Sequence, residues 1–450
     1  NATCSPRDLD LADARNATDF CGNRTPTRNP CWQEGANISC LPFFMLVGGM
    51  KCGTTTLSYL LGTHPDIERP ILKEVRYLSG GTINRKTTSW YASNFQPLAR
   101  AITREISDSG TWSSKVTFDA SPTYLMDMDV ATPWILRHIP ETKLLAILRN
   151  PVDRSYSHHR MGVDFALSSQ RCKCLFDSNC RNDHHKGDSK LMNDTRAEVL
   201  SSVLSFAWVA RVGIAELAAA RCGVSEPRSQ LARVWMRKRS YVPVLKFEMN
   251  ESHSLCVKRR FGPSVYSATL ETVSSLQAND AIPEEVQQTA YRTYQMLNTC
   301  AQGMARPKKV VENSLYVKRI RTWLKTFGRQ LKVLTLEDLK SDGKRTMSGV
   351  YQFLGIRPFA HTTLSLQNSK CVSGPNGVLS SPKDDVFIQD RSIRQDSSSG
   401  GIRNCSTRTR APNSSTLSSP ANKEAARVLR EFYEPYNKKL YALIGKNLRW

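Results

Sequence analysis

The sequence predicts an α/β fold in which helices flank a central parallel sheet. At residues 43–61, 142–159 and 332–354, a short apolar run is followed by a turn and then by a helical pattern. Short apolar runs bounded by turn residues are typical of strands buried on both faces, as in parallel sheets. With 450 residues, 40% of them hydrophobic, the chain has a globular composition and the length for a sizeable core.

Residues 43–61 predict an anion site. Phe43–Val47 is typical of a buried strand, and Thr54–Leu61 of a helix whose leucines share one face. The tight turn between them contains Gly48, Gly49 and Gly53. The free N–H groups and the positive dipole end of the helix point at this turn, where Lys51 adds a charge. A nucleoside triphosphate loop, G-x-x-x-x-G-K-[ST], is a poor match, because Lys51 precedes Gly53.

The order Lys51-Cys52-Gly53-Thr54-Thr55, followed by a leucine-rich helix and His64-Pro65, resembles the 5′-phosphosulfate loop of sulfotransferases. These enzymes take the sulfuryl group from 3′-phosphoadenosine 5′-phosphosulfate (PAPS). Taken alone, the stretch is also compatible with an ordinary strand-turn-helix corner. The resemblance implies that the donor contacts Lys51, Cys52, Gly53, Thr54, Thr55 and Thr56.

The segment after the loop helix carries the candidate base. In sulfotransferases that act on glycosaminoglycans, a glutamate follows at this distance within a Lys-Glu-x-x-aromatic segment, and Glu74 matches it. The resemblance implies that Glu74 takes the proton of the acceptor hydroxyl, which is a poor nucleophile until that proton has an acceptor. Without the preceding loop, a Lys-Glu pair is more often a surface ion pair.

Residues 115–125 predict a strand that runs into a turn and resemble the family's acidic-x-Ser/Thr-Pro-x-Tyr segment beside the active site. Many glycosaminoglycan sulfotransferases have a lysine just before the Ser/Thr, where this chain has Ala120. We therefore expect one catalytic cation to be absent or to come from elsewhere. The enzymes that 6-O-sulfate 4-sulfated N-acetylgalactosamine are a closer match on this point.

A second phosphate site is predicted where the apolar strand at 142–148 runs into a helix. The pattern R-x-P-x-x-R-x-x-S, from Arg149 to Ser157, resembles the family's 3′-phosphate site. The arginine fork suits a phosphate, and Pro151 suits the first position of a helix. Ser157 can share a helix face with Arg154. The resemblance implies that Arg149 and Ser157 bind the 3′-phosphate of the donor.

The last part of the chain continues the resemblance. It predicts a strand at Lys332–Leu336, a helix at Gly343–Leu354 and a final helix at Lys423–Leu443. In the glycosaminoglycan branch, a disulfide-tied loop ending in Lys-Gly-Arg wraps the nucleotide. The nearest match follows the Cys371–Cys405 loop at Arg408 and Arg410, which the resemblance assigns to the donor. A flexible glycosylated loop is the alternative.

Residues 165–305 predict an insertion that shapes the acceptor site. Within them, Val199–Cys222 is typical of a buried helix that breaks near Gly213. The basic runs at 233–239 and 258–260 fit either an acidic glycan groove or a solvated face. We favour disulfides over a zinc site for the cluster Cys172, Cys174, Cys180, His184 and His185.

The thirteen cysteines suggest an oxidising compartment, the secretory lumen. Cys52 is expected to be free, which leaves an even number to pair. Residues 1–40 predict a disulfide-tied lead-in before a sulfotransferase domain at 41–450. Asn-x-Ser/Thr sites, which also occur by chance, stand at Asn1, Asn16, Asn23, Asn37, Asn193, Asn250, Asn404 and Asn413.

We expect a protein of the Golgi lumen, anchored in full length as a type II membrane protein, or a secreted one. The chain begins at Asn1 without a methionine, and its apolar runs are too short to span a bilayer. A signal or anchor segment is therefore expected to lie outside this sequence.

The formal net charge of +23 predicts an anionic partner. Because no nucleic-acid-binding motif is recognisable, we expect an acidic glycan and a phosphorylated nucleotide rather than nucleic acid. A generally solvated basic surface is the alternative.

Together the motifs predict a P-loop-like sulfotransferase fold with the donor at the carboxyl ends of the strands. The expected reaction moves a sulfuryl group from PAPS to a glycan hydroxyl and leaves adenosine 3′,5′-bisphosphate. Glu74 would act as base and Lys51 would stabilise the leaving group, without a required metal. The rival hypotheses are a nucleotide kinase and a lumenal glycan-binding protein with a vestigial nucleotide site.

Overall fold

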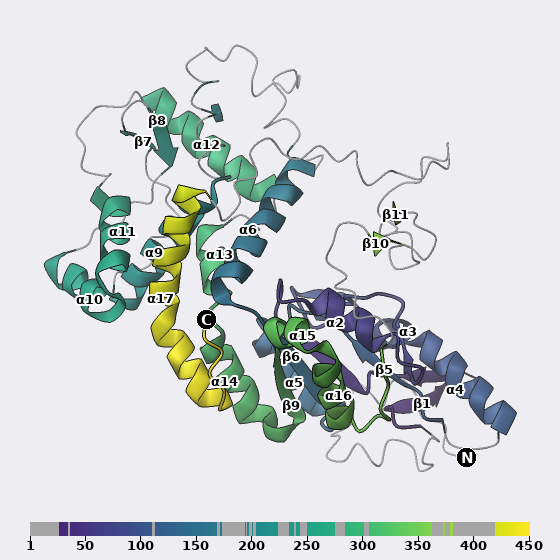
Figure 1. The fold of residues 1–450 in the computed structure, drawn as a ribbon. Helices are drawn as coiled ribbons and strands as arrows, with labels where there is room; N and C mark the ends of the chain where they lie inside the picture. The colour runs from purple at the N-terminus through teal and green to yellow at the C-terminus, as the bar shows by residue number, and fades with distance from the viewer. Residues whose placement is uncertain are drawn as a thin grey trace. The chain divides into compact units, whose positions relative to one another are not determined.

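The computed structural model describes residues 27–34, 37–109, 113–168, 172, 194, 196–197, 200, 204–223, 234–237, 240–243, 250–274, 284–300, 306–361, 372–373, 379–380 and 419–450. The chain divides into two compact units (Figure 1). The first contains residues 1–149 and 319–410, and the second contains residues 150–318 and 411–450. The predicted division at residues 40, 165 and 305 stays a prediction.

The first unit is built on a five-stranded sheet in which each neighbouring pair is parallel, which confirms the predicted fold class. The strands lie in the order β4 (Ile67–Glu68), β5 (Val116–Asp119), β3 (Phe44–Gly48), β6 (Lys143–Leu148) and β9 (Leu331–Thr335). Within this sheet, the chain first forms the central strand β3, then β4 and β5 on one side of it, and then β6 and β9 on the other side. The order of the strands therefore reverses next to the carboxyl end of β3, where α/β sheets bind their ligands.

Helices flank this sheet, as its buried strands require. All five residues of β3 and all four of β5 are buried, so both faces need apolar cover. The helices of the first unit are α2 (Thr54–Leu61), α3 (Thr88–Ser93), α4 (Gln96–Ser109), α5 (Met128–His138), α15 (Leu336–Ser341) and α16 (Gly343–Leu354), with 3-10 turns at Thr82–Asn84 and Gly328–Gln330. Helix α14 (Tyr316–Phe327) precedes β9, and the short strands β10 (Val372–Ser373) and β11 (Leu379–Ser380) pair with each other.

A small hairpin before the sheet explains two of the cysteines. Strands β1 (Cys31–Glu34) and β2 (Asn37–Cys40) pair antiparallel, and a disulfide joins Cys31 to Cys40. Cys40 packs against Leu98 and Ile102 of α4. A disulfide is thus shown for this pair, the lead-in at 1–40 stays a prediction, and Cys4 and Cys21 lie outside the described residues.

The second unit is mainly helical. Its helices are α6 (Pro151–Ser168), α9 (Phe206–Arg221), α10 (Glu251–Phe261), α11 (Pro263–Ser274), α12 (Glu284–Cys300), α13 (Pro307–Glu312) and α17 (Pro420–Ile444), and β7 (Val234–Arg237) pairs with β8 (Ser240–Pro243). Helix α9 lies among α11, α13 and α17 (Figure 1). Phe206 of α9 and Phe432 of α17 belong to one apolar core.

Helix α9 corrects one prediction. A break near Gly213 was expected, but the helix runs unbroken from Phe206 to Arg221. A methyl group on Gly213 would lie 2.5 Å from the carbonyl oxygen of Pro307 in α13. The glycine therefore marks a close helix contact and not a break.

Disulfides tie the second unit together. One joins Cys172 to Cys300 and another joins Cys222 to Cys256. The predicted disulfide is thus confirmed for Cys172, while Cys174, Cys180, His184 and His185 lie outside the described residues. Among the residues that the structure describes, no helix has the length and apolar character to cross a bilayer.

Candidate active site

The predicted phosphate loop lies at the carboxyl end of β3, beside the point where the strand order reverses. Lys51 adopts a left-handed backbone conformation with φ 68°, which is uncommon for a residue with a side chain. Gly53 has φ 93° and packs against Leu336, where a methyl group would be 2.6 Å from that side chain. A glycine is required there both for its conformation and for its close packing.

Helix α2 begins without a side-chain cap, because its first position is preceded by Gly53. Its first-turn N–H groups and the positive end of its dipole thus lie beside Lys51, an arrangement that suits an anion. Thr55 is exposed at this end, whereas Thr54 and Thr56 are buried. The hydroxyl of Thr56 has no hydrogen-bond partner among the described residues, although buried hydroxyls normally have one.

Cys52 is buried and carries a free thiol, as predicted. Its Sγ lies 3.7 Å from the carbonyl oxygen of Met50 in the same loop. The residue thus packs inside the loop, next to the partly exposed Lys51.

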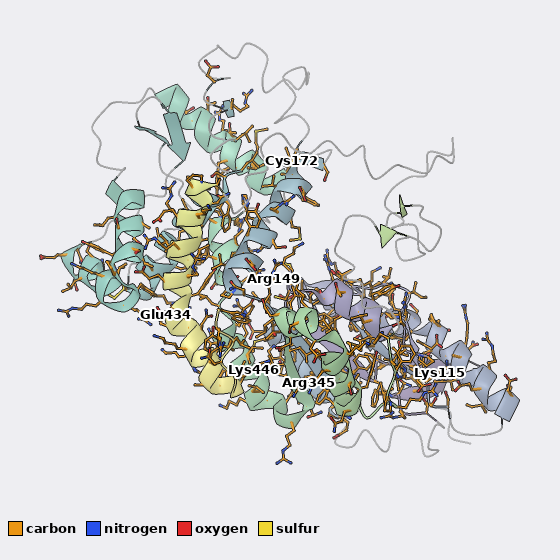
Figure 2. The ribbon with its side chains drawn as sticks, in the orientation of Figure 1. Lys115, Arg149, Cys172, Arg345, Glu434 and Lys446 are labelled. Atoms are coloured by element: carbon orange, nitrogen blue, oxygen red, sulfur yellow. A yellow bond between two sulfur atoms is a disulfide. The ribbon has the colours of Figure 1, made fainter. Side chains whose placement is uncertain are left out.

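The structure brings Arg149 to the loop. Arg149 directly follows β6, the strand next to β3 (Figure 2). Its Nη1 donates to the backbone carbonyl of Lys51 at 3.5 Å. A guanidinium and the start of α2 therefore meet at one edge of the sheet, close enough for a single nucleotide to contact both.

The other residues of the predicted 3′-phosphate motif lie on α6 in the second unit. Pro151 is its first residue, as expected, and Ser157 is half-buried. Arg154 is fully buried and donates to the carbonyl of Val310 at 3.1 Å and to Ser314 at 3.5 Å. Arg154 thus connects α6 to α13 and to Ser314 within the second unit.

Glu74 is held by cations on both of its oxygens. Lys73 donates to Oε1 at 2.8 Å, and Arg76 donates to Oε2 through Nε at 3.1 Å and through Nη2. Burial would by itself raise the pKa of Glu74, but the two cations outweigh it and the pKa lies below its usual range. Glu74 is therefore an ionised carboxylate at neutral pH.

A buried network connects the Glu74 segment to β5. Asp119, the last residue of β5, accepts hydrogen bonds from Ser121 at 2.6 Å, Tyr124 at 2.7 Å and Tyr91 at 2.8 Å. The Ser121 hydroxyl in turn accepts from the backbone N–H of Arg76 at 2.9 Å. The same turn packs on β3, since a methyl group on Gly48 would meet Leu125 at 2.5 Å. The network therefore ties the candidate base to the strand that carries the phosphate loop.

Protonation in this network follows from burial. Burial raises the pKa of Asp119 to about 6, although the three hydroxyl donors lower it and the charge of Glu74 raises it further. Burial and the charge of Asp119 raise the pKa of Tyr91 and Tyr124 far above the usual range. Both tyrosines thus keep their protons and remain donors.

Two predictions are not connected to this site. Arg408 and Arg410 lie outside the described residues.

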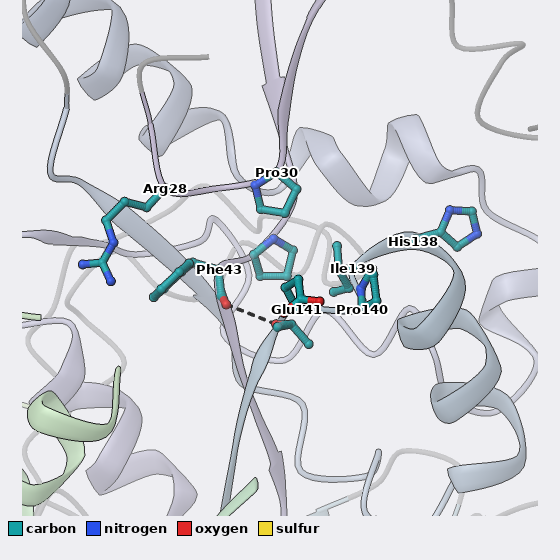
Figure 3. Close-up of a pocket in the computed structure, with 9 residues that line it drawn as sticks. Arg28, Pro30, Phe43, His138, Ile139, Pro140 and Glu141 are labelled. Atoms are coloured by element: carbon teal, nitrogen blue, oxygen red, sulfur yellow. Dashed lines mark hydrogen bonds between the residues drawn. The ribbon is translucent and has the colours of Figure 1, made fainter. Parts of the chain in front are cut away.

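A small pocket opens at the amino ends of β3 and β6, at the end of the sheet opposite the predicted phosphate loop. There Thr142 donates to the carbonyl of Phe43 (Figure 3). It is lined by Arg28, Pro30, Pro42, Phe43, His138, Ile139, Pro140, Glu141 and Thr142.

Sequence reasoning missed the roles of Arg76 and Asp119. The sequence shows that Arg76 stands two residues after Glu74 and has the opposite charge. It does not show that the backbone of Arg76 is left-handed, with φ 53°. Asp119 was visible as the acidic residue of its motif. Its partner Tyr91, 28 residues earlier in the chain, meets it only through the fold.

No family model matches the chain. Over 137 residues it is 30% identical to membrane-associated sulfotransferase kil1 of Dictyostelium discoideum, which covers 30% of this chain and 26% of that protein. Over 180 residues it is 30% identical to bifunctional heparan sulfate N-deacetylase/N-sulfotransferase 1 of Caenorhabditis elegans, which covers 36% of this chain and 19% of that protein. The chain thus spans a minor part of these relatives, and the part that matches is related to sulfotransferases.

Among solved structures, a sulfotransferase from Alicyclobacillus acidocaldarius is 16% identical, with coverage of 91% of this chain and 98% of that one and a TM-score of 0.36. At that TM-score the match adds nothing to the fold described above. The narrower resemblance to enzymes that act on 4-sulfated N-acetylgalactosamine receives no support from these relatives.

Proposed function

We propose that this chain is a PAPS-dependent sulfotransferase that modifies an acidic glycan. The observation that carries the proposal is the meeting of Lys51, the uncapped start of α2 and Arg149 at the carboxyl edge of the sheet. Similarity to sulfotransferases supports the donor, and the net charge of +23 supports an anionic acceptor. One of the relatives is named for heparan sulfate.

The chain offers donors to both charged ends of such a nucleotide. Lys51, the N–H groups of residues 53–56 and the exposed hydroxyl of Thr55 would hold the 5′ end. The buried, unpartnered hydroxyl of Thr56 fits a ligand oxygen at the same place. Arg149 would hold the 3′-phosphate, and Ser157 stays a prediction of the resemblance. Arg408 and Arg410 stay predictions of the resemblance.

Glu74 supplies the base in this proposal. Its ionised carboxylate takes the proton of the acceptor hydroxyl as the hydroxyl oxygen bonds to sulfur and the bond from sulfur to the phosphate oxygen breaks. Lys51 and the start of α2 stabilise the charge that grows on the departing oxygen. These steps need positioning and charge, as in phosphoryl transfer, and no covalent bond to the protein.

The acceptor atom is proposed to be a hydroxyl. The heparan sulfate relative is named as an N-sulfotransferase, for which the acceptor would be an amine. An amine and a hydroxyl each lose a proton as the bond to sulfur forms, so the ionised Glu74 suits either acceptor. The choice of a hydroxyl on an acidic polysaccharide such as chondroitin or dermatan sulfate rests on the resemblance of the Glu74 segment to glycosaminoglycan sulfotransferases.

We place the protein in the Golgi lumen. Its disulfides Cys31–Cys40, Cys172–Cys300 and Cys222–Cys256 suit an oxidising compartment. The glycosylation sites at Asn37 and Asn250 are exposed. A membrane anchor in the full-length protein stays part of the proposal.

Transfer of labelled sulfate from PAPS to a panel of polysaccharides and their amine-bearing forms tests the proposal. We expect transfer by the wild type, loss of at least a hundredfold in kcat for Glu74→Gln and Lys51→Ala, and weaker donor binding for Arg149→Ala. All three variants should keep the wild-type Tm. Normal transfer by Glu74→Gln would remove Glu74 as the base.

A glycan-binding protein with a vestigial nucleotide site is the second candidate, favoured by the overall basic charge alone. Such a protein would bind the polysaccharides without transferring sulfate. Addition of adenosine 3′,5′-bisphosphate should raise the Tm of a sulfotransferase and leave that of the glycan-binding protein unchanged.

A further inference from the structure

Both oxygens of the proposed base already accept from a cation. Lys73 lies on Oε1, and Arg76 lies on Oε2 with two of its nitrogens. A general base needs a lone pair directed at the proton that it removes. In this arrangement the acceptor hydroxyl and a cation compete for the same carboxylate.

Arg76 is the cation that can leave. Its side chain is 59% exposed, against 23% for Lys73 and 26% for Glu74. The backbone of Arg76 is fixed, because its N–H donates to the buried Ser121 hydroxyl, which is itself bonded to Asp119. Movement of the guanidinium therefore leaves the segment and the carboxylate in place.

We infer that Arg76 determines acceptor specificity: it covers Glu74 until an oxyanion on the acceptor, a sulfate or a carboxylate, draws the guanidinium away and opens Oε2 to the hydroxyl. The inference rests on the proposed function and names its substrate class. Guanidinium groups bind sulfate and carboxylate with paired hydrogen bonds, so an anionic acceptor replaces the lost partner. A neutral acceptor offers no such replacement.

The charges around Glu74 favour the exchange. Asp119 is an acid near enough for the charge of Glu74 to raise its pKa, and it is buried with hydrogen bonds from three hydroxyls. Lys73 stays on Oε1 and keeps the carboxylate paired after Arg76 moves. Removal of one of two cations strengthens the base, because an ion pair with a cation lowers the proton affinity of a carboxylate.

The alternative is that Arg76 only holds the loop in place. Its removal would then lower activity on charged and uncharged acceptors by the same factor. The two cases are separated by the ratio of kcat/KM values and not by either value alone.

The test compares the wild type with Arg76→Asn, because asparagine tolerates the left-handed backbone of this position. Arg85→Asn is the matched control, since Arg85 is an exposed arginine in the same stretch. The acceptors are one sulfated polysaccharide, its desulfated form, and a form that is also carboxyl-reduced. Comparing the three distinguishes sulfate from carboxylate as the group that Arg76 binds.

For the wild type and Arg85→Asn we expect kcat/KM on the best charged acceptor to exceed that on the uncharged one about tenfold. In Arg76→Asn the ratio should fall towards one, mainly through a rise on the uncharged acceptor. The acid limb of its kcat/KM profile should also move to higher pH. An unchanged ratio, or an equal loss on all acceptors, would overturn the inference.

Calorimetric binding of a sulfated oligosaccharide without the donor keeps the two proposals apart. Arg76→Asn should bind it several-fold more weakly than Arg85→Asn does. Equal binding by the two variants overturns the role of Arg76 whatever the activity. Absence of transfer by the wild type on every acceptor would instead refute the proposed function.

Discussion

At the end of β5, Asp119 is buried and accepts three hydroxyl hydrogen bonds. Its pKa is about 6 in the folded chain, against 3.8 for a free aspartate. The folded state therefore holds the proton more tightly, and the stability that this group contributes is lost as pH rises from about 4 to about 6. At neutral pH the buried charge costs roughly 3 kcal/mol. A costly carboxylate that is tied through Ser121 to the Glu74 segment points to a positioning role.

We predict that Asp119→Asn lowers kcat about tenfold with little change in donor KM. The amide keeps the shape of the carboxylate but accepts fewer hydrogen bonds, so the turn at Ser121 loosens its hold on the backbone of Arg76 beside Glu74. Steady-state kinetics and Tm check this. Tyr91→Phe is the control, because Tyr91 bonds to Asp119 and does not bond to the segment at 74–76. Equal kcat values for the wild type and Asp119→Asn would count against positioning.

At the scale of elements, close packing decides where glycines stand. Helix α9 runs through Gly213 because α13 approaches it there, with Pro307 and Val311 in the space of the missing side chain. On α16, Gly349 has no such neighbour among the described residues, where a methyl group would meet only Lys332 Nζ at 3.9 Å. The two helical glycines look alike in the sequence, but a close neighbour excludes a side chain at Gly213, whereas there is space for a methyl group at Gly349.

We therefore predict opposite effects of the same substitution. Gly213→Ala should destabilise by about 1–3 kcal/mol, because the added methyl overlaps a backbone carbonyl. Gly349→Ala should stabilise by up to about 1 kcal/mol, because alanine favours a helix where space is open. Denaturant unfolding of the two variants measures both values. A stable Gly213→Ala would show that the contact between α9 and α13 is loose.

At the scale of the whole molecule, the two units contain buried groups that respond to acid in opposite ways. In the second unit, burial lowers the pKa of His159 to about 4. The unfolded chain then binds the proton more readily, so stability is lost as pH falls from about 6.5 towards about 4. In the first unit Asp119 takes up its proton over much of that range, which favours the folded state.

We predict that mild acid weakens the second unit through His159. The full effect is roughly 3 kcal/mol, approached near pH 4. His159→Phe, which keeps a ring beside Phe206, should remove most of the fall in Tm between pH 7 and pH 5. A variant with the same acid sensitivity as the wild type would assign the effect to other groups.

Local sequence was sufficient for several features. The bounds of α2 and α16, the start of α6 at Pro151 and the central strands follow from apolar runs, glycines and proline within a few residues of each other. The loop at Lys51 and the residue Arg149 were predicted as site residues from the family resemblance of the same stretches. Some predicted ends differ from the observed ones: β9 covers Leu331–Thr335 instead of 332–336, and α17 starts at Pro420 instead of Lys423.

The sequence by itself determined the strand, the glycine-containing loop with Lys51 and the start of α2, because residues that are neighbours in the chain form these features, and their arrangement suits an anion. Only the tertiary structure decided that Arg149 reaches Lys51, that Tyr91 reaches Asp119, and that Gly213 lies against α13. Each of these depends on strand order or helix packing, which bring together residues far apart in the chain. The paired cations on Glu74 also depend on the fold, because the backbone N–H of Arg76 donates to Ser121, 45 residues further along the chain.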